Sequence, residues 1–146
     1  MQKRLAKVFH CSTEFTLHVL GGKWKTVILC YLAQRPFRYA ELRKLMPAVS
    51  DKILTERLHE LVTAGLVARK KVDGGRVEAY GLTPTGKSLG KLLGELYGWG
   101  ESHAASFGVS VGQPLKAFKA ATAANVAARS TDSPGAVPRG RGRIRH

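Results

Sequence analysis

The chain has 146 residues, a length that suits one ordinary domain with a single core and short appendages. Its 24 Lys and Arg residues against 10 Asp and Glu residues give a formal net charge of +14, which favours a polyanionic partner, nucleic acid first and an anionic membrane surface second. No apolar run reaches the roughly 20 residues of a membrane span, the N-terminus lacks the apolar stretch of a signal peptide, and two cysteines are too few for a disulfide scaffold, so we expect a cytoplasmic protein.

Charge and composition change together near residue 111. Residues 1 to 110 hold 17 basic and 9 acidic residues, whereas residues 111 to 146 hold 7 basic residues and 1 acidic one. The second segment is rich in Ala, Gly and Arg, with one short helix expected at about 114 to 129 and disorder expected beyond residue 130. We therefore predict a folded domain over 1–110 and a basic tail over 111–146.

Two helices are predicted in the N-terminal part. Apolar residues recur at helical spacing from Trp24 to Leu32, which predicts a helix that ends near Gln34, before Pro36. The preceding stretch, 12 to 20, alternates like a strand in part, but N-cap residue types at 12 and 13 and the glycine pair at 21 and 22 favour a short helix.

A helix-turn-helix is predicted next. A short helix of about residues 40 to 46 is stopped by Pro47, and Ser50 caps a longer helix that ends at Gly65. The apolar residues of the second helix share one face, which leaves the other face free to contact a DNA groove. The candidate DNA contacts on it are Ser50, Lys52, Thr55, Glu56 and His59. For any one of them, the alternative is an ordinary solvated side chain.

A two-stranded hairpin is predicted after Gly65. The segments 66 to 72 and 77 to 83 flank an AspGly turn, with a bulge expected near Gly81. Such a wing would bring basic side chains to a phosphate or a minor groove. Its candidates are Lys70, Lys71 and Arg76, and the weaker phosphate candidates Lys23 and Lys25 stand at the start of an earlier helix.

The last predicted helix begins at Thr83 and Pro84, an N-cap and N1 pair, and carries a wide apolar stripe. A domain this small does not easily cover such a stripe alone, so we expect a homodimer interface. Its candidate residues are Leu89, Leu92, Leu93, Leu96 and Trp99. The predicted fold is α+β and mainly helical, a winged helix-turn-helix with a two-stranded wing and flanking dimerisation helices.

Several stretches carry a family resemblance. They are GlyGlyLysTrpLys at 21 to 25, AlaGluLeuArg at 40 to 43, ProAlaValSerAspLysIleLeuThrGluArgLeu at 47 to 58, GlyLeuVal at 65 to 67 and TyrGlyLeuThrProThrGly at 80 to 86. In this order the chain resembles the HxlR-type winged-helix regulators. The resemblance implies cytoplasmic DNA-binding dimers that regulate nearby genes, several of which sense oxidants or electrophiles through an N-terminal cysteine.

The cysteines differ in what they predict. Cys11 directly precedes a predicted helix whose first amides point toward it, with Lys7 and His10 nearby, and these surroundings favour a thiolate. Cys11 is thus a candidate redox sensor, with a buried packing residue in the dimer interface as the alternative. Cys30 lies beside the apolar face of its helix and is expected to be a core residue.

The function predicted from these patterns is a sequence-specific regulator of transcription that binds double-stranded DNA as a homodimer. The five histidines show no metal-ligand spacing, and the chain has no phosphate-cradling loop or nucleophile elbow, so we expect no metal, no cofactor and no enzymatic activity. The effector is left open. Two alternatives are a non-specific architectural or RNA-binding basic protein, favoured by the ArgGly tail, and an interaction module whose charge serves only solubility.

Overall fold

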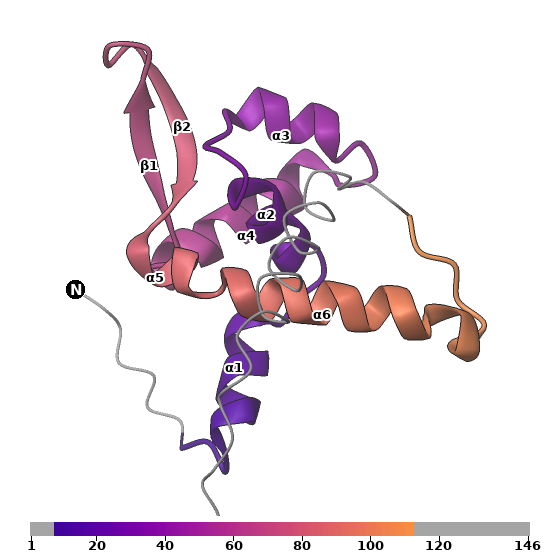
Figure 1. The fold of residues 1–146 in the computed structure, drawn as a ribbon. Coiled ribbons are helices and arrows are strands. Elements are labelled where there is room, and N and C mark those ends of the chain that lie inside the picture. The colour runs from indigo at the N-terminus through magenta and orange to yellow at the C-terminus, as the bar shows by residue number, and fades with distance from the viewer. Residues whose placement is uncertain (1–7, 113–146) are drawn as a thin grey trace, which may run out of the picture.

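The computed structural model describes residues 8–112, so the predicted helix at 114 to 129 and the basic tail beyond residue 112 lie outside the described residues. The elements are α1 (Ser12–Leu20), α2 (Lys25–Leu32), α3 (Tyr39–Leu45), α4 (Asp51–Thr63), β1 (Val67–Val72), β2 (Val77–Leu82), α5 (Pro84–Ser88), α6 (Gly90–His103) and the 3-10 turn η1 (Ala104–Phe107). Figure 1 shows α2, α3 and α4 gathered beside the two-stranded sheet, α6 crossing beneath them and α1 pointing away. The predicted winged helix-turn-helix fold is confirmed.

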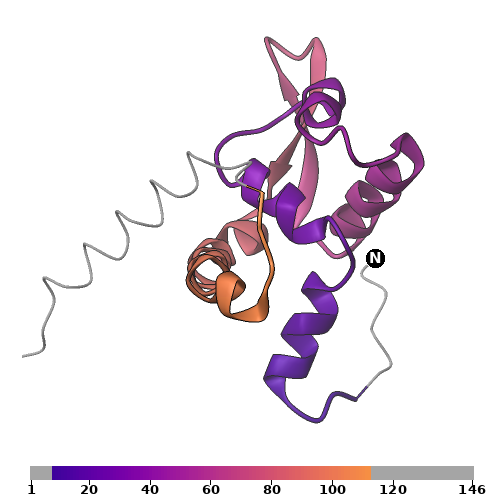
Figure 2. The same cartoon turned by 90° about the vertical axis from the view of Figure 1, so that its right-hand side faces the viewer.

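The two N-terminal helices form as predicted, with different caps. The sulfur of Cys11, rather than a hydroxyl at 12 or 13, accepts the backbone N–H of Glu14 at 3.4 Å and so caps α1. Trp24 adopts a left-handed conformation with φ 82° immediately before α2, and therefore stands outside the helix that was predicted to include it. Figure 2, in which α6 is viewed nearly end-on, shows α1 descending away from the other helices.

The helix-turn-helix begins one residue before its predicted start. The backbone N–H of Arg38 donates to the Glu41 carboxylate at 2.7 Å, a side-chain cap that lets α3 start at Tyr39 although Ala40 offers no capping group. Ser50 caps α4 as predicted, its hydroxyl accepting the Ile53 N–H at 3.2 Å. These caps fix where the two helices start.

The wing is a regular antiparallel hairpin. Its register runs without interruption from Val67 opposite Leu82 to Val72 opposite Val77, so the bulge predicted near Gly81 is wrong. Gly81 pairs directly with Ala68, and the aliphatic chain of Lys70 lies over the place that a side chain at 81 would take. A further bridge, which was not predicted, joins Phe37 and Tyr80 through backbone hydrogen bonds of 3.0 and 2.8 Å.

The single C-terminal helix predicted from Pro84 to Trp99 is two helices, α5 and α6, which meet at Leu89. The Leu89 N–H bonds to the carbonyl of Gly86 three residues earlier, which tightens the last turn of α5 before Gly90 begins α6. Glycines at 86 and 90 weaken a continuous helix here. The break redirects α6 across the underside of the domain (Figure 1).

The core lies where α2, α3, α4 and the base of the wing meet. Its largest fully buried side chains are Ile28, Leu29, Leu42, Leu54, Leu58, Leu61, Val49 and Val67. Among the described residues no polar or charged residue is buried. The face of α4 opposite its polar side chains therefore packs on a continuous apolar core.

Candidate nucleic-acid interface

The outward face of α4 is the polar one. Lys52, Thr55, Glu56 and His59 are exposed, while Leu54 and Leu58 on the opposite face are buried. The separation follows from helical spacing, since apolar residues three and four apart all turn toward the core. The structure thus places the sequence-predicted side chains together on one accessible helix surface.

The first turn of α4 is anchored to α3 through Asp51. The hydroxyl of Tyr39 and the Nε of Arg43 both donate to Asp51 Oδ1, each at 2.8 Å. The hydrogen bond from Tyr39, followed by the charge of Arg43, holds the pKa of the Asp51 carboxyl below its usual value. Thr55 joins this network, with its Oγ1 3.5 Å from the Tyr39 hydroxyl oxygen. The arrangement fixes the angle between the two helices of the motif.

The wing presents a row of exposed basic side chains. Lys70, Lys71 and Arg76 are all exposed, with Arg76 in the turn between the strands, and the neighbouring Arg69 is exposed as well. The Nζ of Lys70 donates to the carbonyl of Leu82 at 3.1 Å, so its ammonium is hydrogen-bonded within the domain. Of the three predicted contacts, Lys71 and Arg76 are therefore better placed than Lys70 to contact a phosphate.

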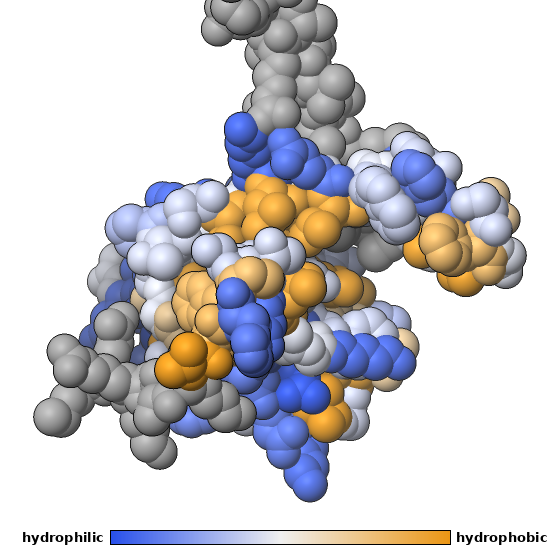
Figure 3. All heavy atoms as spheres, turned by 90° about the horizontal axis from the view of Figure 1, so that it is seen from below, coloured by the Kyte–Doolittle hydropathy of each residue, from blue (hydrophilic) through white to orange (hydrophobic). Residues whose placement is uncertain are grey.

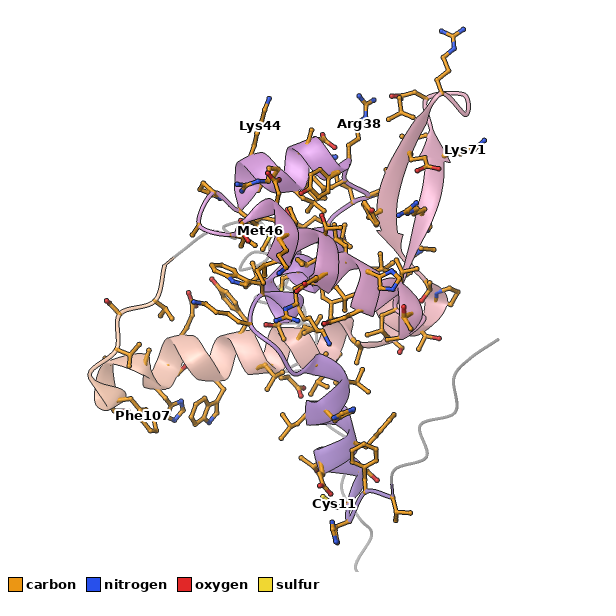
Figure 4. The ribbon with its side chains drawn as sticks, turned by 180° about the vertical axis from the view of Figure 1, so that it is seen from behind. Cys11, Arg38, Lys44, Met46, Lys71 and Phe107 are labelled. Atoms are coloured by element: carbon orange, nitrogen blue, oxygen red, sulfur yellow. The ribbon has the colours of Figure 1, made fainter. Side chains whose placement is uncertain are left out.

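An ion pair ties the wing to the helix-turn-helix. Arg38, at the N-cap of α3, pairs with Asp73 in the wing turn, and Asp73 has a positive φ of 53°. Arg38 and Lys44 project from α3 toward the same side as the wing, on which Lys71 is labelled (Figure 4). Sequence reasoning missed this α3 contribution, although four basic residues between 35 and 44 were a usable signal.

Of the two cations at the start of α2, Lys25 is engaged within the domain, whereas Lys23 is exposed. Lys25 Nζ lies 3.0 Å from Glu60 Oε2 and its side chain is only 15% exposed. The ammonium of Lys23 lies 5.1 Å from the centre of the Trp24 ring, and the Lys23 carbonyl accepts from Arg57 Nε at 3.1 Å. These contacts join α2 to α4 and leave Lys25 unsuited to a phosphate contact.

The apolar stripe of α6 divides into a core half and an exposed half. Leu93 is buried, and Leu89 and Leu92 pack against the core. Leu96 and Trp99 are 45% and 57% exposed. Seen from below, apolar side chains gather in patches on this underside (Figure 3).

The exposed half continues into neighbouring elements. The Trp99 ring stacks on His103 with centroids 4.5 Å apart and lies 6.1 Å from Phe107, which is itself 70% exposed. On α1, Phe15 and Leu17 are also exposed. Exposed apolar side chains on two projecting helices form a surface of the kind that protein interfaces cover.

The two cysteines differ as the sequence suggested. Cys11 is exposed at the far end of α1, on the opposite side of the molecule from the wing (Figure 4). Of its predicted neighbours, Lys7 lies outside the described residues, and His10 pairs with Glu14, with Nδ1 and Oε2 3.4 Å apart. Cys30 is buried, and burial raises the pKa of its thiol to about 11.

Within residues 8–112, no group of three or more His, Cys, Asp or Glu side chains is arranged to hold a metal ion. Over the same range, no helix has the length and apolar character that crossing a bilayer requires.

Comparison with known proteins agrees with this geometry. The HxlR-like helix-turn-helix family model matches residues 19–107. The HTH-type transcriptional regulator YtcD of Bacillus subtilis is 42% identical over 99 residues, which are 66% of this chain and 78% of YtcD.

Two solved structures are also similar. The redox regulator HypR in its oxidised form is 34% identical, with a TM-score of 0.57, over 63% of this chain and 96% of that chain. Quinone-bound YodB from B. subtilis is 31% identical, with a TM-score of 0.54, over 62% of this chain and 96% of that chain. The family match spans both the polar helix α4 and the basic wing. The chain therefore belongs to the HxlR-like helix-turn-helix family of transcriptional regulators.

Proposed function

We propose that this regulator binds double-stranded DNA in a sequence-specific manner as a homodimer. The observation that carries the proposal is the exposed polar face of α4, flanked by the basic side chains of the wing and α3. A helix of this kind can enter a major groove, where Lys52 would meet guanine O6 and N7, while the wing meets phosphates or the adjacent minor groove. Acting on chromosomal DNA, the protein would work in the cytoplasm, by binding rather than by catalysis.

The homodimer is supported by the exposed half of the α6 stripe, Leu96 and Trp99, together with the apolar side chains of α1. One recognition helix reads only a few base pairs, so a second copy supplies the second half-site. In the proposed assembly α6 and α1 form the dimer contact. Leu93 is buried in the core of each subunit and so anchors α6 rather than touching the partner.

Base reading and phosphate binding are separable by two substitutions. We expect Lys52→Ala to cost about 1 to 3 kcal/mol on the preferred duplex and to relax specificity at one position. We expect Arg76→Ala to weaken binding to all sequences alike and to lower the slope of log affinity against log salt by about 1. Titrations of both variants against preferred and random duplexes, at several salt concentrations, measure this. Equal and sequence-independent losses would reject Lys52 as a base reader.

We further propose that Cys11 responds to oxidants or electrophiles. Its sulfur is exposed and accepts a helix N-terminal N–H, and two similar structures are a redox regulator in its oxidised form and a quinone-bound regulator. In a dimer joined through α1, modification there would alter the spacing of the two recognition helices.

Alkylation by iodoacetamide at neutral pH should be fast at Cys11 and slow at Cys30, whose thiol is buried and has a raised pKa. A quinone should change DNA affinity for the wild type and for Cys30→Ser but not for Cys11→Ser. If Cys11 reacts no faster than a free thiol and all three proteins respond alike to quinone, Cys11 is a packing residue and the signal acts elsewhere.

A non-specific architectural role is the second candidate function, favoured by the +14 net charge. It predicts equal affinity for every duplex, so affinities for a selected and a random duplex at the same salt concentration distinguish the two functions.

A further inference from the structure

Helices α2 and α6 line a cavity of about 360 Å³ that is partly open to solvent. Its walls are Thr26, Val27 and Cys30 of α2, Leu93, Leu96 and Tyr97 of α6, and Gly112. On each helix the three residues lie within four positions of one another and share a face, so the cavity is a gap between two packed helix surfaces. A volume of this size lies at the lower end of the roughly 300 to 1,000 Å³ typical of small-molecule sites.

The walls select an uncharged ligand. Among residues 8–112, none of the side chains that line the cavity is charged, although the chain as a whole carries +14. Cys30 is only 7% exposed, and because burial raises its pKa to about 11 it stays a neutral thiol at physiological pH. In the described part of the lining, hydroxyl groups come from Thr26 and Tyr97, and the Tyr97 hydroxyl donates to Glu101 Oε1 at 3.1 Å. A small, mostly apolar molecule with a single hydrogen-bonding group matches this lining.

The cavity adjoins the helix that supports α4. Helix α2 packs against both α4 and α6. At its N-terminal end, Lys25 pairs with Glu60 at 3.0 Å, and the Lys23 carbonyl accepts from Arg57 at 3.1 Å. A molecule that alters the separation of α2 and α6 therefore alters the position of α4 relative to the exposed face of α6.

We propose that this cavity binds a small, neutral, mostly apolar molecule, and that its occupancy changes the affinity of the protein for DNA. The cavity is distinct from Cys11, which stands at the N-terminal end of α1. Binding in the cavity is non-covalent. The regulatory part rests on the proposed function, whereas ligand binding itself does not.

The test titrates the full chain with N-phenyl-1-naphthylamine, a neutral fluorescent apolar molecule. We expect saturable fluorescence with the wild type. Thr26→Phe, which fills the cavity from α2, should weaken binding at least tenfold. The matched control Thr85→Phe, at an exposed position of α5, should bind as the wild type does. Circular dichroism shows whether each variant is folded. As a second readout in Cys11→Ser, the amine should slow modification of Cys30 by methyl methanethiosulfonate several-fold.

Three results would overturn the site. The first is the absence of saturable binding, and the second is equal binding by a folded Thr26→Phe variant. The third is loss of binding at protein concentrations where the dimer forms. The last result would show that a second copy fills the cavity. Binding of the amine with no change in affinity for a preferred duplex would overturn the regulatory part. DNA binding measured without the amine tests the proposed function separately, so the two failures are distinguishable.

Discussion

Gly86→Ala is expected to destabilise the domain by about 3 kcal/mol or more, at the upper end of the cost of overpacking. A Cβ atom at position 86 would lie 2.1 Å from the backbone carbonyl oxygen of Leu66. No side-chain rotation relieves that contact, because the obstructing atom belongs to the main chain. Either α5 or the start of the wing must shift.

The shift is costly because the same junction is closed by hydrogen bonds. The Leu66 carbonyl accepts the Thr83 N–H at 3.0 Å, and the Thr83 hydroxyl donates to the Gly65 carbonyl at 2.6 Å while accepting the Gly86 N–H at 3.0 Å. Urea unfolding measures the change. Gly90→Ala is the matched control, since a Cβ there meets nothing within 4 Å, and it should raise stability by up to about 1 kcal/mol. An unchanged midpoint for Gly86→Ala would show that the α5 junction is looser than described.

Trp99→Asp is expected to convert a dimer into a monomer and to lower affinity for a two-half-site duplex by about 100-fold or more, because the second half-site no longer binds in the same event. The side chain is 57% exposed on α6, and a carboxylate within an apolar contact would be left desolvated and unpaired. The wild type should sediment at twice the chain mass of 15.9 kDa.

The control for this prediction is Leu45→Asp, which places the same charge at a 41% exposed leucine at the end of α3. Its sedimentation should remain that of the dimer. A wild type that sediments as a monomer at micromolar concentration, or a Trp99→Asp variant that stays dimeric, would remove α6 from the proposed interface.

Local patterns predicted the recognition helix well. The cap at Ser50, the buried spacing of Leu54 and Leu58, and the exposed face from Lys52 to His59 all follow from helical periodicity and capping, which depend on residues within a few positions. The positions of α2, the wing strands and their turn followed in the same way.

Features that depend on distant residues were not predicted. The Arg38 and Asp73 ion pair joins residues 35 positions apart, and the bridge between Phe37 and Tyr80 spans a similar separation. Neither leaves a periodic signal in the sequence. The α6 stripe is a different case, because periodicity shows that a helix face is apolar but does not show that its first half packs on the subunit's own core, as Leu93 does.

The proposed function requires that α4 read base sequence in a dimer. Selection of bound duplexes from a random pool by the full chain, followed by affinity measurement at fixed salt, tests this requirement. We expect enrichment of a palindrome with half-sites about one helical turn, roughly 10 to 10.5 base pairs, apart, bound roughly 10³-fold or more tightly than random duplex. A pool that shows no enriched sequence, with equal affinity for all duplexes, would contradict it and leave the non-specific architectural role.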